Sequence, residues 1–241
     1  MCLIITYELL INFLVLFLKR APVGHSFVLP TGYSTVVYQQ VTDTPGVCDT
    51  HRPLEEVHRE ICKSVATVIP GPHAVIMCLR CDRRFTDEEY QAYEQLKKLF
   101  GNGLKDYMIL VFNGLDQVGT RPDFRKLGQK IKNLGLVLDD LVSDDRLIVF
   151  NNEASWESRK EQGDQLLDAV VGVFESNNRQ YFTDDIMKKF EAAMEQKLAQ
   201  GMTREEVQAA VINNDHSVTT VFEKQLPKEE VKKRGGGCTI L

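Results

Sequence analysis

The sequence predicts an α/β fold, a doubly wound and mostly parallel sheet followed by a helical extension. Three runs, 74–79, 107–112 and 146–150, are almost continuously apolar, as expected of parallel strands that helices cover on both faces. Segments with helical spacing separate these runs, and strand alternating with helix is typical of doubly wound sheets. After residue 150 no further strand pattern is evident, so the remainder is predicted to be helical.

An earlier strand and three helices complete the predicted sheet domain. The strand is VVYQQVT at 36–42, and the helices are expected at 53–69, 87–100 and 122–141. In the second helix, one stripe contains Tyr90, Tyr93, Leu96, Leu99 and Phe100. Thr86 and Glu89 have the spacing of a capping box, which satisfies free amides at a helix start.

Two more amphipathic stripes predict helices in the C-terminal third. The first contains Leu166, Leu167, Val170, Val171 and Phe174, and the second contains Met187, Phe190, Met194 and Leu198. Thr183 and Thr203 are predicted N-caps, the latter with Glu206 in capping-box register.

Composition and charge exclude some classes of function. The 241 residues carry a net charge of −5, so no basic field indicates a nucleic-acid partner. The six cysteines have no framework spacing, which favours a reducing compartment. Cys78 and Cys81 form a single C-x-x-C without a second pair, and core or strand-end thiols are a better interpretation than a zinc site.

The chain divides into four predicted parts: an apolar N-terminal segment at 1–20, an α/β domain at 21–180, a helical extension at 181–230 and a basic, glycine-rich tail at 231–241. Residues 3–18 are apolar apart from Glu8 and Asn12, and Lys19 and Arg20 follow. This segment is either an alternative or truncated start or a signal-anchor that leaves the downstream chain in the cytosol.

Three short motifs at the ends of predicted strands suggest a guanine-nucleotide site. In VTDTPG, Asp43 is placed to hold Mg²⁺ through water, and the Gly46 amide to contact a terminal phosphate. Each motif alone is compatible with an ordinary turn. Their order along successive strands makes the combination far more specific.

The other two motifs would read the base. In NGLD, the Asp116 carboxylate can accept the two N–H bonds of the guanine edge, which adenine lacks, while Asn113 ties the loops together. Gly114 stands where N-K-x-D motifs have a lysine that covers the base plane. Asn151 and Asn152 would flank the base with amides.

These motifs resemble the immunity-associated (GIMAP/IAN) GTPases, septin-like relatives of Ras with an AIG-type G domain. The matching stretches are DTPGVCDT, LRCDRRFTDEEYQAYEQLKKLFG at 79–101, VFNGLD, RLIVFNN and the segment 165–191. The resemblance covers about residues 41–195. It implies a P-loop-type G-domain fold, GTP and GDP binding with Mg²⁺, homo- or heterodimers with family members, and membrane attachment in some members. It also suggests Arg84 as a candidate to act in trans on a partner's phosphates, with an ordinary solvated residue just before a helix as the equal alternative.

The phosphate loop of such domains is missing from this sequence. No Gly-Lys pair occurs anywhere, so the lysine and hydroxyl of G-x-x-x-x-G-K-[ST] are absent. Val47 stands where Ras-type enzymes position water with a glutamine. We therefore expect weak or no GTP binding and negligible hydrolysis. The chain is either a truncated GTPase product, which we favour, or a pseudo-GTPase that pairs with intact family members.

The C-terminal end predicts lipidation. Cys238-Thr239-Ile240-Leu241 is a prenylation signal, preceded by a basic patch and a glycine tether. This predicts a cytoplasmic protein at the cytosolic face of a membrane. Residues 201–226 loosely resemble a ubiquitin-associated domain, but a variable helical extension is the preferred interpretation over a ubiquitin partner.

Overall fold

The computed structural model describes residues 13–20, 37–43, 69–124, 126, 132–139, 144–213 and 215. Gly46, Val47, nearly all of the predicted helix 53–69, and the tail with Cys238 lie outside these residues. None of the helices in the described part is long and apolar enough to cross a membrane.

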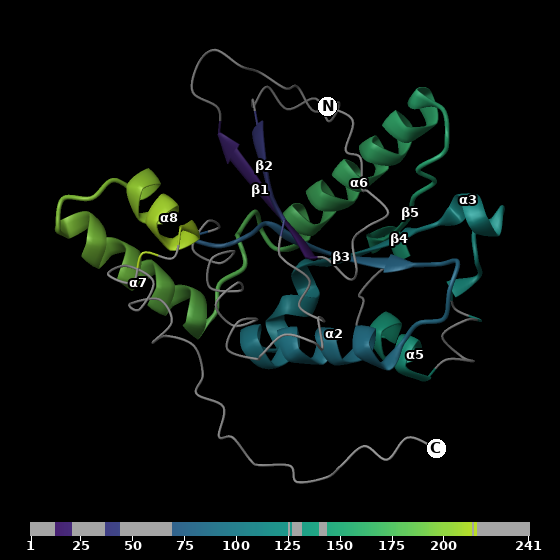
Figure 1. Cartoon of the computed structure of the whole chain (residues 1–241), viewed down its shortest axis with the longest axis horizontal. Helices are drawn as coiled ribbons and strands as arrows, with labels where there is room; N and C mark the ends of the chain where they lie inside the picture. Colours follow the sequence, from purple (N-terminus) through teal and green to yellow (C-terminus); the bar gives the residue numbers. More distant parts are fainter. Residues whose placement is uncertain are drawn as a thin grey trace, which may run out of the picture.

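The described residues contain a five-stranded sheet in the order β2-β1-β3-β4-β5 (Figure 1). The strands are β1 Phe13–Arg20, β2 Val37–Asp43, β3 Ala74–Arg80, β4 Met108–Asn113 and β5 Leu147–Val149. The last three pair in parallel, with Arg80 opposite Asn113 and Phe112 opposite Val149. The predicted parallel α/β architecture is confirmed.

Strand β1 was not predicted. It pairs antiparallel with β2 on one side and with β3 on the other, so the second half of the apolar N-terminal run occupies an interior position of the sheet. An apolar run of this kind is compatible with an interior strand as well as with a membrane segment. Because β1 is antiparallel to both neighbours, β2 runs in the same direction as β3.

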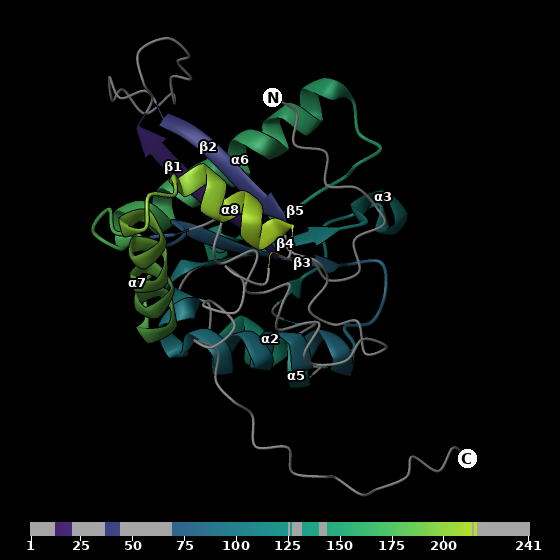
Figure 2. The same cartoon turned by 60° about the vertical axis from the view of Figure 1, so that its left-hand side comes forward.

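Helices cover both faces of the sheet (Figures 1 and 2). Helix α2, Asp87–Phe100, and helix α5, Lys132–Asp139, lie on one face, and α6, Trp156–Ser176, lies on the other. The predicted capping box of α2 is confirmed, since Thr86 N donates to Glu89 Oε2 at 2.7 Å and Glu89 N donates to Thr86 Oγ1 at 3.3 Å. The 3₁₀ turns Asn102–Tyr107 and Asp144–Arg146 precede β4 and β5.

Each face of the sheet has its own apolar core. Alternate residues of β3 divide between them: Val75, Met77 and Leu79 pack toward α2, whereas Ala74, Ile76 and Cys78 pack toward α6. On α6 the most buried residues are Leu166, Ala169, Val170 and Val173. The predicted stripe is thus correct at its start but rotated at its end, where Phe174 is only partly buried and stacks edge-on against His73.

The helical extension packs against the sheet domain. Helix α7, Asp185–Ala199, and helix α8, Arg204–Ile212, contribute Met187, Phe190, Met194 and Val207 to the core on the α2 face. Asp184, not the predicted Thr183, caps α7, because its carboxylate is the group that accepts the Met187 amide, at 2.7 Å. The predicted capping box of α8, Thr203 with Glu206, is confirmed.

The linker before α7 is held by a close backbone approach. Phe182 N donates to Pro72 O at 2.7 Å, and a Cβ on Gly71 would lie 1.9 Å from Phe182 O. The buried Phe182 ring meets Phe100 and Tyr107 edge-on. Only a glycine fits at position 71, so the sequence itself encodes this docking.

Candidate functional site

Two loops meet at the carboxyl edge of the sheet. One follows β4 and leads into the short helix α3, Leu115–Val118, and the other follows β5 and leads into α6. Phe150 N donates to Phe112 O at 2.7 Å, and Leu115 N donates to Phe150 O at 3.3 Å. These bonds bring Asn113 and Asp116 beside Asn151 and Asn152, as the order of the motifs predicted.

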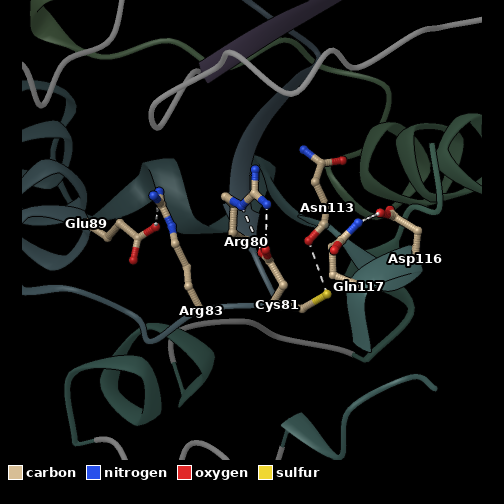
Figure 3. A network of polar contacts seen from close by, with 8 residues as sticks. Arg80, Cys81, Arg83, Glu89, Asn113, Asp116 and Gln117 are labelled. Atoms are coloured by element: carbon tan, nitrogen blue, oxygen red, sulfur yellow. Dashed lines mark hydrogen bonds and ion pairs between the residues drawn. The ribbon is translucent and has the colours of Figure 1, made fainter. Parts of the chain in front are cut away.

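Asn113 is the buried polar residue at the centre of this edge. Its side chain is 8% exposed, and its Oδ1 has no hydrogen-bond partner among the residues that the structure describes. Its main-chain carbonyl accepts from Cys81 N at 2.9 Å and from Cys81 Sγ at 3.1 Å (Figure 3). A buried acceptor without a donor costs free energy, so this position suits a group that a ligand or another segment supplies.

The carboxylate of Asp116 lies in the first turn of α3, where the free amides of a helix start favour a negative charge. Its Oδ2 accepts from Gln117 Nε2 at 2.6 Å. Gly114, which precedes it, has φ +88°, a left-handed conformation that side chains disfavour. The geometry of the loop thus explains why glycine stands where a lysine is usual in such motifs.

The loop after β5 is fixed by its own side chains. Asn151 N donates to Gln162 Oε1 at 3.0 Å, and Asn151 Oδ1 accepts from Glu153 N at 2.9 Å. Asn152 presents a buried Nδ2 that has no hydrogen-bond partner within the described part of the chain. The site therefore combines a buried acceptor on Asn113, a buried donor on Asn152 and a carboxylate on Asp116, which matches the mixed donor and acceptor edge of a purine.

An ion pair that sequence reasoning missed borders this site. Arg80, the last residue of β3, donates from Nε to Asp82 Oδ1 at 2.8 Å and from Nη2 to Asp82 Oδ2 at 2.5 Å. The hydrogen bond from Arg80 lowers the pKa of Asp82, so the carboxylate stays ionised. A Cβ on Gly114 would lie 2.7 Å from Asp82 Oδ1, so this pair packs directly on the loop after β4.

The loop between β3 and α2 presents Arg84 to solvent. Its neighbour Arg83 has Nη2 3.6 Å from Glu89 Oε1 (Figure 3). The Thr86 capping box fixes the end of the loop. Burial raises the pKa of Glu89, which is 1% exposed, against the lowering effects of Thr86 and Arg83. Arg84 is accessible to a partner, and it makes no described contact with Asn113 or Asp116.

Asp43 does not join the other predicted residues at the edge. It pairs with Leu14, which in turn pairs with Ile76, so Asp43 is level with a residue four positions before Arg80. At about 3.3 Å per residue, this places Asp43 about 13 Å back along the strand direction. Gly46, its predicted companion, lies outside the described residues.

Comparison with known proteins then decides the family. Residues 35–201 match the AIG1 family, which is more than half of the chain. The chain belongs to the AIG1 family. This confirms the family resemblance and the G-domain fold class predicted from the motifs.

Curated relatives of this AIG1 chain come from Arabidopsis thaliana. Immune-associated nucleotide-binding protein 9 is 29% identical over 164 residues, which is 63% of this chain and 44% of the relative. Immune-associated nucleotide-binding protein 10 is 31% identical over 163 residues, 66% of this chain and 35% of the relative. Immune-associated nucleotide-binding protein 3 is 34% identical over 147 residues, which is 59% of this chain and 43% of the relative. The chain thus spans less than half the length of these relatives.

The predicted ligands of the AIG1 site fit a base better than a metal. The orphaned atoms of Asn113 and Asn152 suit a purine edge. For Mg²⁺, Asp43 is the predicted ligand, and no group of three or more acidic, histidine or cysteine residues that could hold a metal occurs among the described residues. Arg80 and Asp82 could have been found from sequence only by noting that charged residues directly follow an apolar strand.

Proposed function

We propose that this AIG1 chain is a guanine-nucleotide-binding protein of the GIMAP/IAN type that acts as a GTP/GDP switch at a cytosolic membrane face. The observation that carries this proposal is the junction of the loops that follow β4 and β5, called the base loops from here on. It joins the Asp116 carboxylate to the buried, unsatisfied amide groups of Asn113 and Asn152. The printed names of the Arabidopsis relatives, nucleotide-binding proteins, agree with a nucleotide as the ligand.

The chemistry of these groups accounts for the proposed selectivity for guanine over adenine. The Asp116 carboxylate accepts the N1 and 2-amino protons of guanine, and adenine offers no such pair of donors. The Asn152 Nδ2 donor suits the O6 carbonyl of guanine, whereas adenine has an amino group at that position. A site built to pair with a polar group rejects an analogue that lacks it, because its own buried groups then remain unsatisfied.

Binding and hydrolysis are proposed to be weak. The sequence has no Gly-Lys pair to cradle the β- and γ-phosphates, and Val47 replaces a water-positioning glutamine. When bound, Mg²⁺ would neutralise phosphate charge, but Asp43, its predicted water-mediated ligand, is set back along β2 from the other predicted site residues. The chain's own residues supply base selection, and phosphate affinity must come from other groups.

Titration of the full chain with a fluorescent GDP analogue tests the proposal. We expect unlabelled GDP and GTP to displace the analogue and ATP to fail at the same concentration. Equal displacement by ATP, or absence of saturable binding by a protein with a folded circular-dichroism spectrum, would contradict it. Turnover is measured in parallel as phosphate release, and a rate typical of efficient GTPases would refute the predicted impairment.

A substitution at Asp116 gives a sharper test. Asp116→Asn replaces an acceptor by an amide that also donates, so it suits xanthine, whose 2-carbonyl accepts where guanine donates. We expect affinity to shift from GDP to xanthosine diphosphate. Asp123→Asn, a carboxylate that pairs with Lys126 on the neighbouring loop, serves as the matched control and should leave selectivity unchanged.

The alternative function is a non-catalytic module that dimerises with intact family members. The fixed loop between β3 and α2 supports it, because Arg84 is exposed there while Arg83 and Thr86 are held by Glu89. Light scattering of the chain, alone and mixed with a complete AIG1-family GTPase, distinguishes the two functions. Pairing that needs GTP favours the switch with Arg84 acting in trans, and pairing without nucleotide favours the module.

Membrane attachment through Cys238 is part of the same proposal. The sequence CTIL at the end of the chain, the basic run at 232–234 and three glycines support it. Mass spectrometry of the C-terminal peptide from eukaryotic cells should show a prenyl adduct that Cys238→Ser removes. An unmodified peptide would refute lipidation without affecting the nucleotide proposal.

A further inference from the structure

Two arginines belong to the face of the sheet that α6 covers, at the edge where the base loops meet. Side chains alternate along a strand, and Ala74, Ile76 and Cys78 pack toward α6, so Arg80 continues the same face. Asn113 follows Ile109 and Val111 in the same way on β4. Figure 3 shows Arg80 and Asn113 extending in the same direction from neighbouring strands.

The second arginine comes from the start of α6. Arg159, Gln162 and Leu166 are spaced by three and four residues, so they share one face of the helix. Leu166 is buried against the sheet, and Gln162 reaches the Asn151 amide at 3.0 Å. Arg159 is therefore one turn closer to the edge on the sheet-facing side. Its Nε is buried and has no hydrogen-bond partner in the part of the chain that the structure describes.

The Asp82 carboxylate fixes the orientation of the Arg80 guanidinium. Its Nε and Nη2 bind the two carboxylate oxygens of Asp82, and the side chains of Arg80 and Asp82 are 23% and 18% exposed. A guanidinium that a carboxylate orients loses little conformational entropy on meeting an anion. The matching geometry of guanidinium and phosphate then gives short, charge-assisted hydrogen bonds.

The sheet order shows which part of a nucleotide these arginines would meet. The base belongs between the loops after β4 and β5, and β5 is the last strand of the described sheet. The sheet therefore continues only toward β3, and neighbouring strands are about 4.8 Å apart. Arg80 lies one strand from Asn113 in that direction, about where the ribose and first phosphates follow the base.

We propose that Arg80, oriented by Asp82, and Arg159 bind the phosphates of the guanine nucleotide. They supply guanidinium N–H donors from β3 and α6, in a chain whose sequence has no Gly-Lys phosphate loop. This inference rests on the proposed function, since it assigns a further part of the same site. It differs from the role of Arg84, which lies on the exposed loop and would act on a partner's phosphates.

Comparing ligands that share the guanine base but differ in phosphate number separates phosphate contacts from base contacts. The affinities of guanosine, GMP and GDP are measured by calorimetry for the full chain and for Arg80→Gln and Arg159→Gln. We expect each substitution to weaken GDP binding about tenfold, the scale of one charge-assisted hydrogen bond, and to leave guanosine binding within about twofold. Arg80→Lys, which keeps the charge but loses the fork, should lie between the wild type and Arg80→Gln.

Lys160→Gln is the matched control, because it removes one positive charge next to Arg159 from a side chain that is 58% exposed and pairs with Asp164. Lys160→Gln should change neither the affinity for guanosine nor the affinity for GDP. Equal losses for guanosine and GDP, or GDP affinities unchanged in both arginine variants, would overturn the inference while nucleotide binding itself stands. A wild-type protein that binds neither guanosine nor GDP would instead refute the proposed function, and the inference with it.

Discussion

Gly114 is the position where a single methyl group tests the geometry of the base loop. Gly114→Ala places a Cβ at a residue with φ +88°, in contact with Asp82 at 2.7 Å from Oδ1 and 3.0 Å from Cγ. Real Cβ atoms essentially never approach this closely, so Asp82 must move. Its fork with Arg80 and its packing on the loop are then lost together.

The expected cost has two parts. The left-handed backbone conformation costs about 1–2 kcal/mol for an L-residue with a Cβ. Displacing Asp82 from this partly exposed, charge-assisted pair adds about 1–2 kcal/mol, less than for a buried pair because both side chains retain solvent contact. The free energy of unfolding should therefore fall by about 2–4 kcal/mol.

Gly119 provides a control at the other end of the same short helix. It has φ +79°, and a Cβ there would meet nothing within 4 Å. Gly119→Ala therefore pays only the backbone part, about 1–2 kcal/mol. Urea unfolding of both variants, monitored by circular dichroism, gives the Asp82 contribution as their difference.

A double-mutant cycle identifies the contact itself. In an Asp82→Ala background the obstructing carboxylate is gone, so Gly114→Ala should cost no more than Gly119→Ala. The reasoning would be refuted if Gly114→Ala and Gly119→Ala were equally destabilising in the wild-type background, or if removing Asp82 left the cost at Gly114 unchanged.

Three further predictions concern the rest of the fold. Gly71→Ala, whose Cβ would lie 1.9 Å from Phe182 O, should undock the linker before α7, seen as faster amide hydrogen exchange over residues 182–199; unchanged exchange would contradict the docking. Because burial raises the pKa of Glu89, the folded state holds its proton more tightly than the unfolded state, and stability falls as pH rises through the interval above the ordinary glutamate pKa. Glu89→Gln should flatten that slope in urea unfolding measured at pH values above the ordinary glutamate pKa, and an identical slope would reject this assignment. Arg146→Met removes the hydrogen bonds from Arg146 to Asp106 O at 2.7 Å and to Ser176 Oγ at 3.1 Å, and leaves Asp106 O with the Asn177 Nδ2 donor at 2.9 Å. It should cost about 2–4 kcal/mol, whereas a loss below about 0.5 kcal/mol would show that the buried contacts are dispensable.

The base loops were predictable from sequence because their signals are local. An apolar strand followed at once by N-G-L-D or F-N-N places those side chains at the carboxyl edge of a parallel sheet, whatever the rest of the chain does. The capping boxes at Thr86 and Thr203 are equally local, since both partners lie within four residues. The N-cap of α7 was misplaced by one residue because two adjacent side chains, Thr183 and Asp184, can both cap a helix.

Other features depended on contacts between distant segments. Residues 1–20 suggested a signal-anchor or an alternative or truncated start, because an apolar run looks the same whether lipid or protein covers it. The pairing of residues 13–20 with β2 and β3 is a nonlocal choice. The same pairing sets Asp43 back from the edge, which its motif alone could not indicate.

By itself, the sequence determined the family, the three parallel strands with their helices, and which residues end those strands at the edge where we propose that the base binds, since each depends on short-range pattern and strand direction. Only the tertiary structure decided that the apolar N-terminal run enters the sheet, that Asp82 packs on Gly114, and that Arg80 and Arg159 belong to one face. Those arrangements arise from packing between residues far apart in the chain, where burial and close approach, not local propensity, select the partner.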